Sequence, residues 1–257
     1  MMSGDLRPYQ EVLKPECVAE YETAHADVYH RLIDINTSIK ILETIACFPL
    51  KHLFDPYEPF FQTLYWNFTS TCVVMLHALL EGTEPFGIQQ FKNRLVRDWL
   101  PEHEQQTLKN RLRGVRFTEK AQRIKNRAAA MRDRVIAHRD PLVATGSLKV
   151  PGLTIVDLRA LYSETEALFG ACCFRTEYVT SLYPPGTVGG RPVERDIERF
   201  MKLLLRDSEW LMQPERHGQQ WPEMRKRMSQ ADLDELNHWR VQLGLPDALN
   251  DRAKGEG

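Results

Sequence analysis

The stretch FFQTLYWNFTSTCVVMLHALL, Phe60 to Leu80, decides the fold of this chain. It contains no Asp, Glu, Lys or Arg, and its apolar residues recur at the spacing of one helix face. A helix that is apolar nearly all round is a buried one, so we expect this helix to be central and nearly surrounded. The apolar run from Thr71 to Leu80 is much shorter than the roughly 20 residues that a membrane-spanning helix needs.

Further helices are expected on both sides of this central one. Apolar residues from Val18 to Ile45 step by three and four, which predicts a helix over 16–46 with Pro15 suited to its first turn. Thr118 and Thr154 are suited to cap two later helices. The other predicted helical ranges are Ile88–Leu100, Glu102–Leu112, Thr118–His138, Thr154–Val179, Glu194–Leu211 and Gln230–Leu243. No alternating strand pattern accompanies them, so the predicted class is all-α, a helical bundle.

Proline and glycine positions suggest how the chain is divided. We expect a helical domain over 15–183 with a basic helical insert at 88–116, a helical extension over 187–245 and a flexible tail over 246–257. The first residues lack the basic start and apolar run of a secretory signal. The five cysteines form no CxxC pair. These features predict a cytoplasmic protein without membrane contact, disulfide framework or zinc site.

Charge is distributed unevenly along the chain. The formal net charge is -1, but the segment from Lys92 to Asp140 holds fourteen Lys or Arg against six acidic residues. A basic middle in an otherwise acidic chain indicates a local site for a polyanion. A solvated basic helix face is the alternative interpretation.

The helix expected from Thr118 to His138 carries the residues best suited to chemistry. An apolar stripe along it leads into position 138 and consists of Ala121, Ile124, Ala128, Met131 and Val135. On an ideal helical wheel Arg132 lies on one flank of this stripe and His138 on its other edge. Arg139 shares the flank of Arg132, and Arg123, Arg127 and Arg134 lie further round on the side of His138. Such a helix suits packing against a second copy of the chain, with a cation and an imidazole in the seam.

The string MRDRVIAHRD, Met131 to Asp140, resembles the signature of HEPN domains, in which an arginine followed by Asn, Asp or His precedes a histidine. Its RDxxxAHxD form is similar to that of abortive-infection members of this superfamily. In those proteins the motif also follows a long first helix and an apolar second helix that ends in Leu-Leu-acid, here Leu79-Leu80-Glu81. The resemblance in organisation covers 15–180, without the insert at 88–116.

The resemblance implies a HEPN-like bundle that acts as an RNA-cleaving toxin in phage defence, with its catalytic cleft between two copies and no metal or other cofactor. It implies Arg132 and His138 as the catalytic residues. Asp133, Arg134 and Asp140 are the expected supporting residues, and Arg123, Arg127 and Arg139 the expected RNA-binding ones. RNA is the expected substrate and a second copy the expected partner. Whether a cognate antitoxin or nucleotidyltransferase also binds stays open.

The chemistry of these side chains agrees with that expectation. RNA cleavage needs no metal when the ribose 2′-hydroxyl attacks the adjacent phosphorus, provided that one group exchanges protons and another stabilises charge. His138 is suited to be the general acid or base, because an unperturbed histidine has a pKa of about 6.5. Arg132 is suited to bind phosphate through two donors of its planar fork. Asp133 is expected to orient either the arginine or the histidine.

Several alternatives stay open. Arg134 is nearer to His138 on the wheel and is the alternative phosphate ligand. The motif as a whole could be a helix C-terminus whose His and Arg only stabilise the helix dipole. A non-catalytic helical module that binds RNA or a protein is the main rival to a nuclease.

A metal enzyme is the remaining alternative. The Glu-x-x-His pairs Glu22/His25 and Glu235/His238 have the spacing of di-metal sites. Such a site also needs inward carboxylates from two further helices, and the helix from Phe60 to Leu80 has none. On that same helix, we expect His77 to be a satisfied core histidine.

Overall fold

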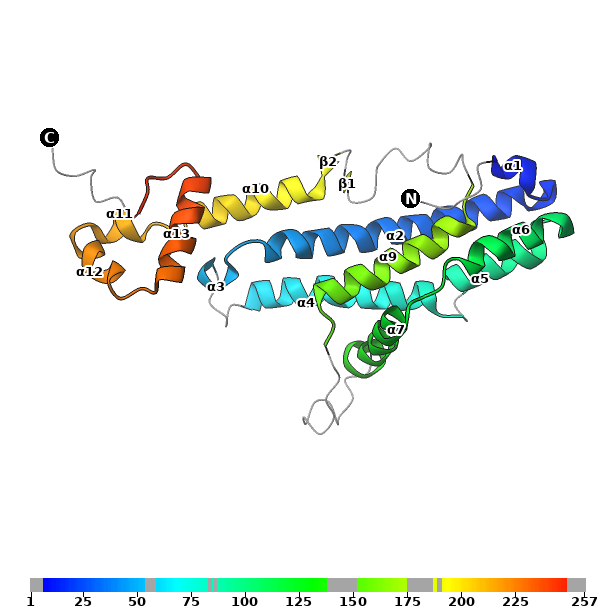
Figure 1. Ribbon diagram of the computed structural model, residues 1–257, viewed down its shortest axis with the longest axis horizontal. Coiled ribbons are helices and arrows are strands. Elements are labelled where there is room, and N and C mark those ends of the chain that lie inside the picture. Colours follow the sequence, from blue (N-terminus) through cyan, green and yellow to red (C-terminus); the bar gives the residue numbers. More distant parts are fainter. Residues whose placement is uncertain are drawn as a thin grey trace. The chain divides into compact units, whose positions relative to one another are not determined.

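The computed structural model describes residues 7–53, 59–82, 85, 87–137, 152–174, 187–188 and 191–248 (Figure 1). Regular structure in these ranges is helical, apart from one antiparallel pair of two-residue strands, β1 (Thr187–Val188) and β2 (Arg191–Pro192). The predicted all-α class is confirmed. The chain divides into two compact units, the first formed by Met1–Glu43 and Gln62–Val193, the second by Thr44–Phe61 and Glu194–Gly257.

Three long helices carry the first unit. They are α2 (Val18–Ala46), α4 (Pro59–Leu80) and α9 (Ile155–Cys172). The short helix α1 (Tyr9–Val12) and a 3-10 turn over Pro15–Cys17 precede α2, which accounts for most of the helix predicted over 16–46. The three helices share one apolar core, to which they contribute Ile35, Ile39, Leu76, Leu79, Leu158 and Leu161, among others. This core fixes the backbone from which the candidate site projects.

The charge-free helix α4 is not surrounded, so this part of the prediction is wrong. One side is buried, with Cys72, Leu76 and Leu79 fully enclosed. On the other side Tyr65 and Trp66 are 45% and 42% exposed. Absence of charge does not require burial, because apolar atoms make up much of any protein surface. Among the described residues, α4 included, no helix combines the length and apolar character needed to cross a membrane.

The basic insert is built into the core of the first unit. It folds as α5 (Ile88–Arg94), a π-helical segment over Leu95–Trp99, and α6 (Glu102–Arg113). Phe91, Trp99 and Leu108 are almost completely buried. The indole Nε1 of Trp99 also donates to Glu20 on α2 at 3.0 Å. The cations of the insert therefore project from a backbone that apolar contacts hold in place.

Both predicted threonine caps are present. Thr118 Oγ1 accepts a hydrogen bond from Ala121 N at the start of α7 (Glu119–Met131). Thr154 and Asp157 form a reciprocal capping box at the start of α9. α9 ends at Cys172, before the predicted end at Val179, and 175–186 lie outside the described residues.

An ion pair ties α9 to α2. Arg159 donates to both carboxylate oxygens of Glu43, from Nε at 2.8 Å and from Nη2 at 2.6 Å. Its Nη1 donates to Asn36 Oδ1 at 2.6 Å. This two-pronged pairing fixes the register of the two helices, since a planar guanidinium needs both acceptors in place.

The second unit combines α3 (Leu50–Leu53) with α10 (Val193–Arg206), α11 (Gln213–His217), a 3-10 turn (Gly218–Gln220), α12 (Trp221–Arg225) and α13 (Gln230–Gln242). Sequence analysis placed 44–61 in the first domain, whereas this segment packs with the C-terminal helices. Phe48, for example, stacks on Trp239 with ring centroids 5.1 Å apart. The helix predicted over Glu194–Leu211 ends at Arg206, and α11 and α12 were not predicted.

A buried arginine organises this second unit. Arg240 on α13 is 1% exposed. It donates to Leu211 O at 2.6 Å and to Pro246 O at 2.8 Å, and it pairs with Glu215. Ala248, in the segment expected to be a flexible tail, accepts a hydrogen bond from Trp221 Nε1 at 3.3 Å. A buried guanidinium is tolerated because nearly all of its donors are satisfied.

Candidate functional site

The described part of the motif, residues 131–137 of Met131–Asp140, lies where α7 changes its hydrogen-bonding pattern. The α-helix ends at Met131, and the chain continues as a π-helical segment over Arg132–Ala137. A π-helix pairs residues five apart, so its turns are wider than those of the ideal wheel. The ideal wheel therefore describes the helix only up to Met131, although Val135, the last residue of the predicted stripe, still contacts the core. His138, Arg139 and Asp140 lie outside the described residues.

Asp133 holds one edge of the Arg132 guanidinium. Its Oδ1 accepts from Arg132 Nε at 2.7 Å and lies 2.5 Å from Nη2. Glu81, directly after α4, is beyond hydrogen-bond distance, with Oε2 3.8 Å from Arg132 Nη1. Among the described residues, none accepts a hydrogen bond from the two Nη1 hydrogens or from the second Nη2 hydrogen, and this outer edge suits a phosphate. The Arg132 side chain is 35% exposed, so part of it is open to an external ligand.

His77 belongs to the same cluster, which sequence analysis missed. Its Nδ1 lies 3.3 Å from Glu81 Oε2 but is buried and forms no hydrogen bond with a described residue. The expectation of a satisfied core histidine is therefore wrong for this nitrogen. Burial lowers the pKa of His77, the charge of Arg132 lowers it further, and Glu81 opposes both. The i, i+4 spacing of His77 and Glu81 was a usable signal, but nothing in the sequence linked either residue to Arg132.

The other described arginines of the motif helix differ in their environment. Arg134 and Arg123 are exposed, and neither forms an ion pair with a described residue. Arg127, expected to bind RNA, is instead engaged inside the protein. Its Nη2 lies 3.3 Å from Asp157 Oδ2 and donates to Gly152 O. Arg127 thus joins α7 to the start of α9, and Arg123 is the expected RNA-binding residue left free in the described segment.

The apolar stripe on α7 packs into its own unit. Ala121, Ile124, Ala128 and Met131 are buried, and Val135 contacts the same core. This stripe was the reason for expecting a second copy at the motif helix. Since its own chain covers it, the stripe does not carry that inference, and the homodimer rests on the resemblance alone.

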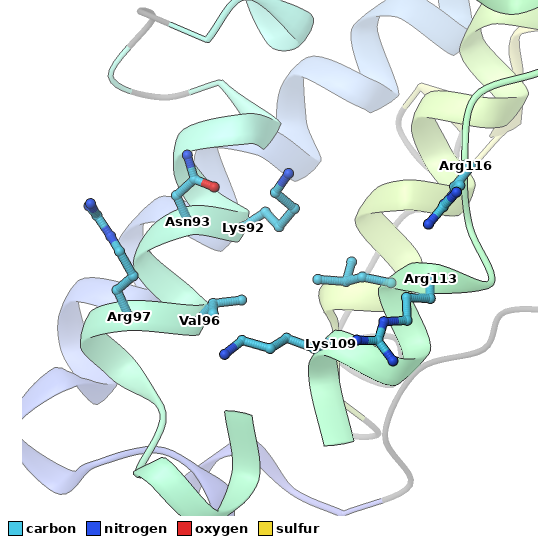
Figure 2. A pocket seen from close by; sticks show the side chains of 8 residues that line it. Lys92, Asn93, Val96, Arg97, Lys109, Arg113 and Arg116 are labelled. Carbon is cyan, nitrogen blue, oxygen red and sulfur yellow. The ribbon is translucent and has the colours of Figure 1, made fainter. Parts of the chain in front are cut away.

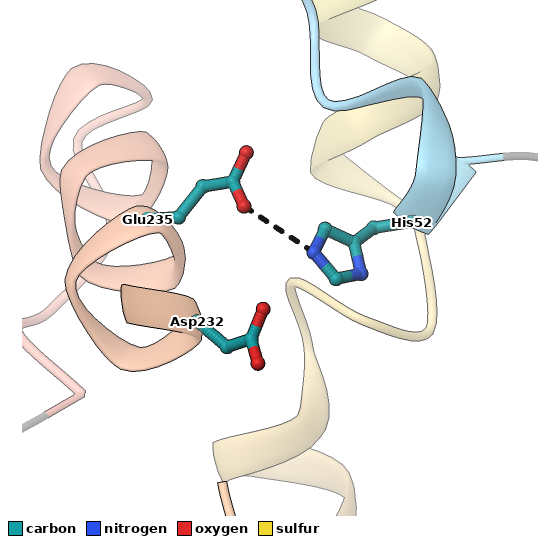
Figure 3. A group of neighbouring side chains, drawn as sticks. All are labelled: His52, Asp232 and Glu235. Atoms are coloured by element: carbon teal, nitrogen blue, oxygen red, sulfur yellow. Dashed lines mark ion pairs between the residues drawn. The ribbon is translucent and has the colours of Figure 1, made fainter. Parts of the chain in front are cut away.

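A second histidine cluster lies in the second unit (Figure 3). One ligand atom from each of His52, Asp232 and Glu235 lies within 4.8 Å of the others. The ammonium of Lys51, however, already pairs with Asp232 at 3.2 Å and Glu235 at 2.9 Å. His52 stacks on Trp210 with ring centroids 4.1 Å apart. The lysine supplies the positive charge between these carboxylates, so the cluster fits a cross-link between α3 and α13 better than a metal centre.

The Glu-x-x-His pairs do not form metal sites in the described part of the chain. Glu22 accepts a hydrogen bond from the hydroxyl of Tyr9 at 2.5 Å. His25 stacks on Phe169 with ring centroids 5.0 Å apart, and burial lowers its pKa to about 4. Its Nε2 lies 3.5 Å from Cys173 Sγ. In the second pair Glu235 contacts Lys51, and His238 is exposed and contacts the ring of Trp239.

Comparison with known proteins adds no relative. No protein-family model matches the chain, and neither a curated protein nor a solved structure is significantly similar to it.

Proposed function

We propose that this protein is an endoribonuclease that cleaves RNA without a metal, with Arg132 and His138 as its catalytic residues. The 2′-hydroxyl attacks the adjacent phosphorus, and the bond from phosphorus to the 5′-oxygen breaks. One proton leaves the 2′-hydroxyl and another reaches the departing 5′-oxygen, so the products are a 2′,3′-cyclic phosphate and a 5′-hydroxyl. His138 serves as general acid or base, and Arg132 stabilises the charge on the phosphorane oxygens.

The contact between Arg132 and Asp133 is the observation that supports this proposal best. It orients the guanidinium through Nε and Nη2, while Nη1 forms no hydrogen bond with a described residue and the side chain is 35% exposed. An arginine held in one orientation gains more from a phosphate, since less freedom is lost on binding. The helix continues from this point as a π-helical turn, a feature frequent at functional sites.

The active form in this proposal is a homodimer of the toxin type in phage defence. Two copies bring two histidines to one phosphate path, which supplies both a proton acceptor for the 2′-hydroxyl and a proton donor for the 5′-oxygen. A two-fold axis makes such a contact self-complementary. Sedimentation over a dilution series, run beside a cleavage assay, tests it: specific activity should fall where the dimer dissociates, and a fully active monomer contradicts it.

A non-catalytic module that binds RNA is the second candidate. The cations that project from α5, α6 and the residues beside them favour RNA binding whether or not cleavage follows. The two functions differ in their dependence on His138, because binding alone survives loss of the imidazole and proton transfer does not.

Incubation of purified protein with total cellular RNA separates these functions. Cleavage should occur equally with and without a chelator, leave 2′,3′-cyclic phosphate ends and stop in His138→Ala. A substrate with a 2′-deoxy sugar at the cut should be inert. Cleavage that chelator removes and a divalent ion restores contradicts the mechanism, and full cleavage by His138→Ala contradicts the site.

A further inference from the structure

A strongly basic pocket lies between the two helices of the insert (Figure 2). Its volume is about 410 Å³. One wall belongs to α5 and the π-helical segment after it, and the other to α6 and the residues that follow. The lining consists of Lys92, Asn93, Val96, Arg97, Lys109, Leu112, Arg113 and Arg116. Five of these eight side chains are cationic and none is acidic.

Carboxylates neutralise little of the positive charge of this basic pocket. Lys109 and Arg116 form no ion pair with a described residue. Lys92 and Arg113 bond to neutral amide oxygens, of Gln89 at 2.7 Å and of Asn110 at 3.4 Å. Arg97 has one carboxylate nearby, at 3.9 Å on Asp98. Clustered like charges repel one another in the folded state, and a bound polyanion removes that repulsion.

Buried residues anchor both walls of the basic pocket, although its cationic side chains are long. Phe91 and Leu95 on one wall and Leu108 on the other are buried in the core of the first unit. Val96 and Leu112 lie at the boundary, partly buried and packed against that core. The core therefore fixes the backbone that carries the five cations, which distinguishes them from charges on an isolated surface helix.

We infer that the basic pocket binds the phosphates of an RNA strand without reading its sequence. The inference rests on the proposed function, for which it names a substrate-holding surface separate from Arg132. Phosphate oxygens match the cations in charge and hydrogen bonding. Among the eight described residues that line the pocket, none is aromatic and able to stack on a base, and Asn93 is the one amide that could meet a base edge. Contacts of this kind position a strand and carry no sequence information.

The test measures binding of a fluorescent single-stranded RNA to the full chain by anisotropy, in a His138→Ala background that prevents cutting. The pocket variant is Arg113→Gln with Arg116→Gln. The matched control is Arg195→Gln with Arg199→Gln, two exposed arginines of α10. Loss of two phosphate contacts should weaken binding roughly 20-fold at about 0.1 M salt and reduce the salt slope by about 1.4. The control should bind like the parent, and oligo-U and oligo-A should bind equally to the parent.

The inference is overturned by unchanged binding in the pocket variant, by equal weakening in both variants, or by a tenfold preference between oligo-U and oligo-A that the pocket variant abolishes. Binding of ATP with no binding of RNA also overturns it and assigns the pocket to a small phosphorylated ligand. If the pocket variant loses binding while the wild-type chain, which retains His138, does not cleave RNA, the pocket inference stands and the nuclease proposal fails. If that chain cleaves RNA and the pocket variant binds normally, the pocket inference alone fails.

Discussion

Arg132 Nη1 lies 3.8 Å from Glu81 Oε2, so the arginine that follows α7 faces the residue that follows α4. Glu81 Oε2 is also 3.3 Å from His77 Nδ1. One carboxylate thus stands between a permanent cation and an imidazole. This arrangement makes the electrostatics of the candidate site testable without an activity assay.

Removal of the Glu81 charge should lower the pKa of His77 further, because Glu81 is the first of the groups that raise it. Removal of Arg132 should raise that pKa, because Arg132 is the largest charge that lowers it. NMR titration of the His77 ring in Glu81→Gln and Arg132→Gln measures both shifts. Shifts of the same sign in the two variants contradict the described cluster. Lys202→Gln serves as a charge-removing control, because Lys202 is not among the charges that shift the pKa of His77, and it should leave that pKa unchanged.

The choice between Arg132 and Arg134 is open to a direct comparison. Arg132→Ala should reduce RNA cleavage by about 100-fold or more, the usual cost of losing a donor to a developing oxyanion. Arg134→Ala should reduce it by less than about tenfold, since an exposed cation adds mainly to the general field. Cleavage rates at saturating RNA measure both. The reverse order would make Arg134 the phosphate ligand.

Acid should destabilise the protein through His25. Its pKa falls from 6.5 in the unfolded chain to about 4 in the folded one. Between these values the unfolded state binds the proton and the folded state does not. The contribution of neutral His25 to the free energy of unfolding is therefore fully present above pH 6.5 and is lost as pH falls towards 4. Each pKa unit corresponds to about 1.4 kcal/mol, which gives a loss of about 3 kcal/mol between pH 7 and pH 4.

Urea unfolding of wild type and His25→Phe at the two pH values isolates this contribution from that of the carboxylates. The variant should lose about 3 kcal/mol less on acidification than the wild type. His103→Phe is the matched control, because His103 is exposed. Equal losses in wild type and His25→Phe would show that His25 does not titrate as its surroundings imply.

Zinc should not stabilise the wild-type protein through His52, Asp232 and Glu235. The Lys51 ammonium occupies the space between the two carboxylates, and its hydrogen bonds to them raise its own pKa. Thermal unfolding with zinc and with chelator should therefore give the same Tm in wild type. In Lys51→Ala zinc should raise the Tm, and Lys51→Ala with Glu235→Gln should abolish that gain. A zinc-dependent Tm in wild type that Glu235→Gln removes would establish a metal site.

The sequence by itself determined the local features of this protein. Thr118 and Thr154 could be predicted as caps because each hydrogen bond joins residues three apart, a distance that the start of any helix sets. The long helix over 16–46 followed from its apolar period for a similar reason. The wheel predicted the packing face of α7 up to Met131, where the π-helical turn ended its validity.

Only the tertiary structure decided which of these elements meet. It put His77 and Glu81 beside Arg132, gave Arg127 an internal partner and joined Lys51 to α13. It also brought the cations of α5 and α6 to opposite walls of one basic pocket. Apolar periodicity predicts that a helix face is buried but does not identify the element that covers it, because any apolar surface of matching shape gives nearly the same burial energy. The polar contacts at the rim of each packed face then follow from that choice of partner.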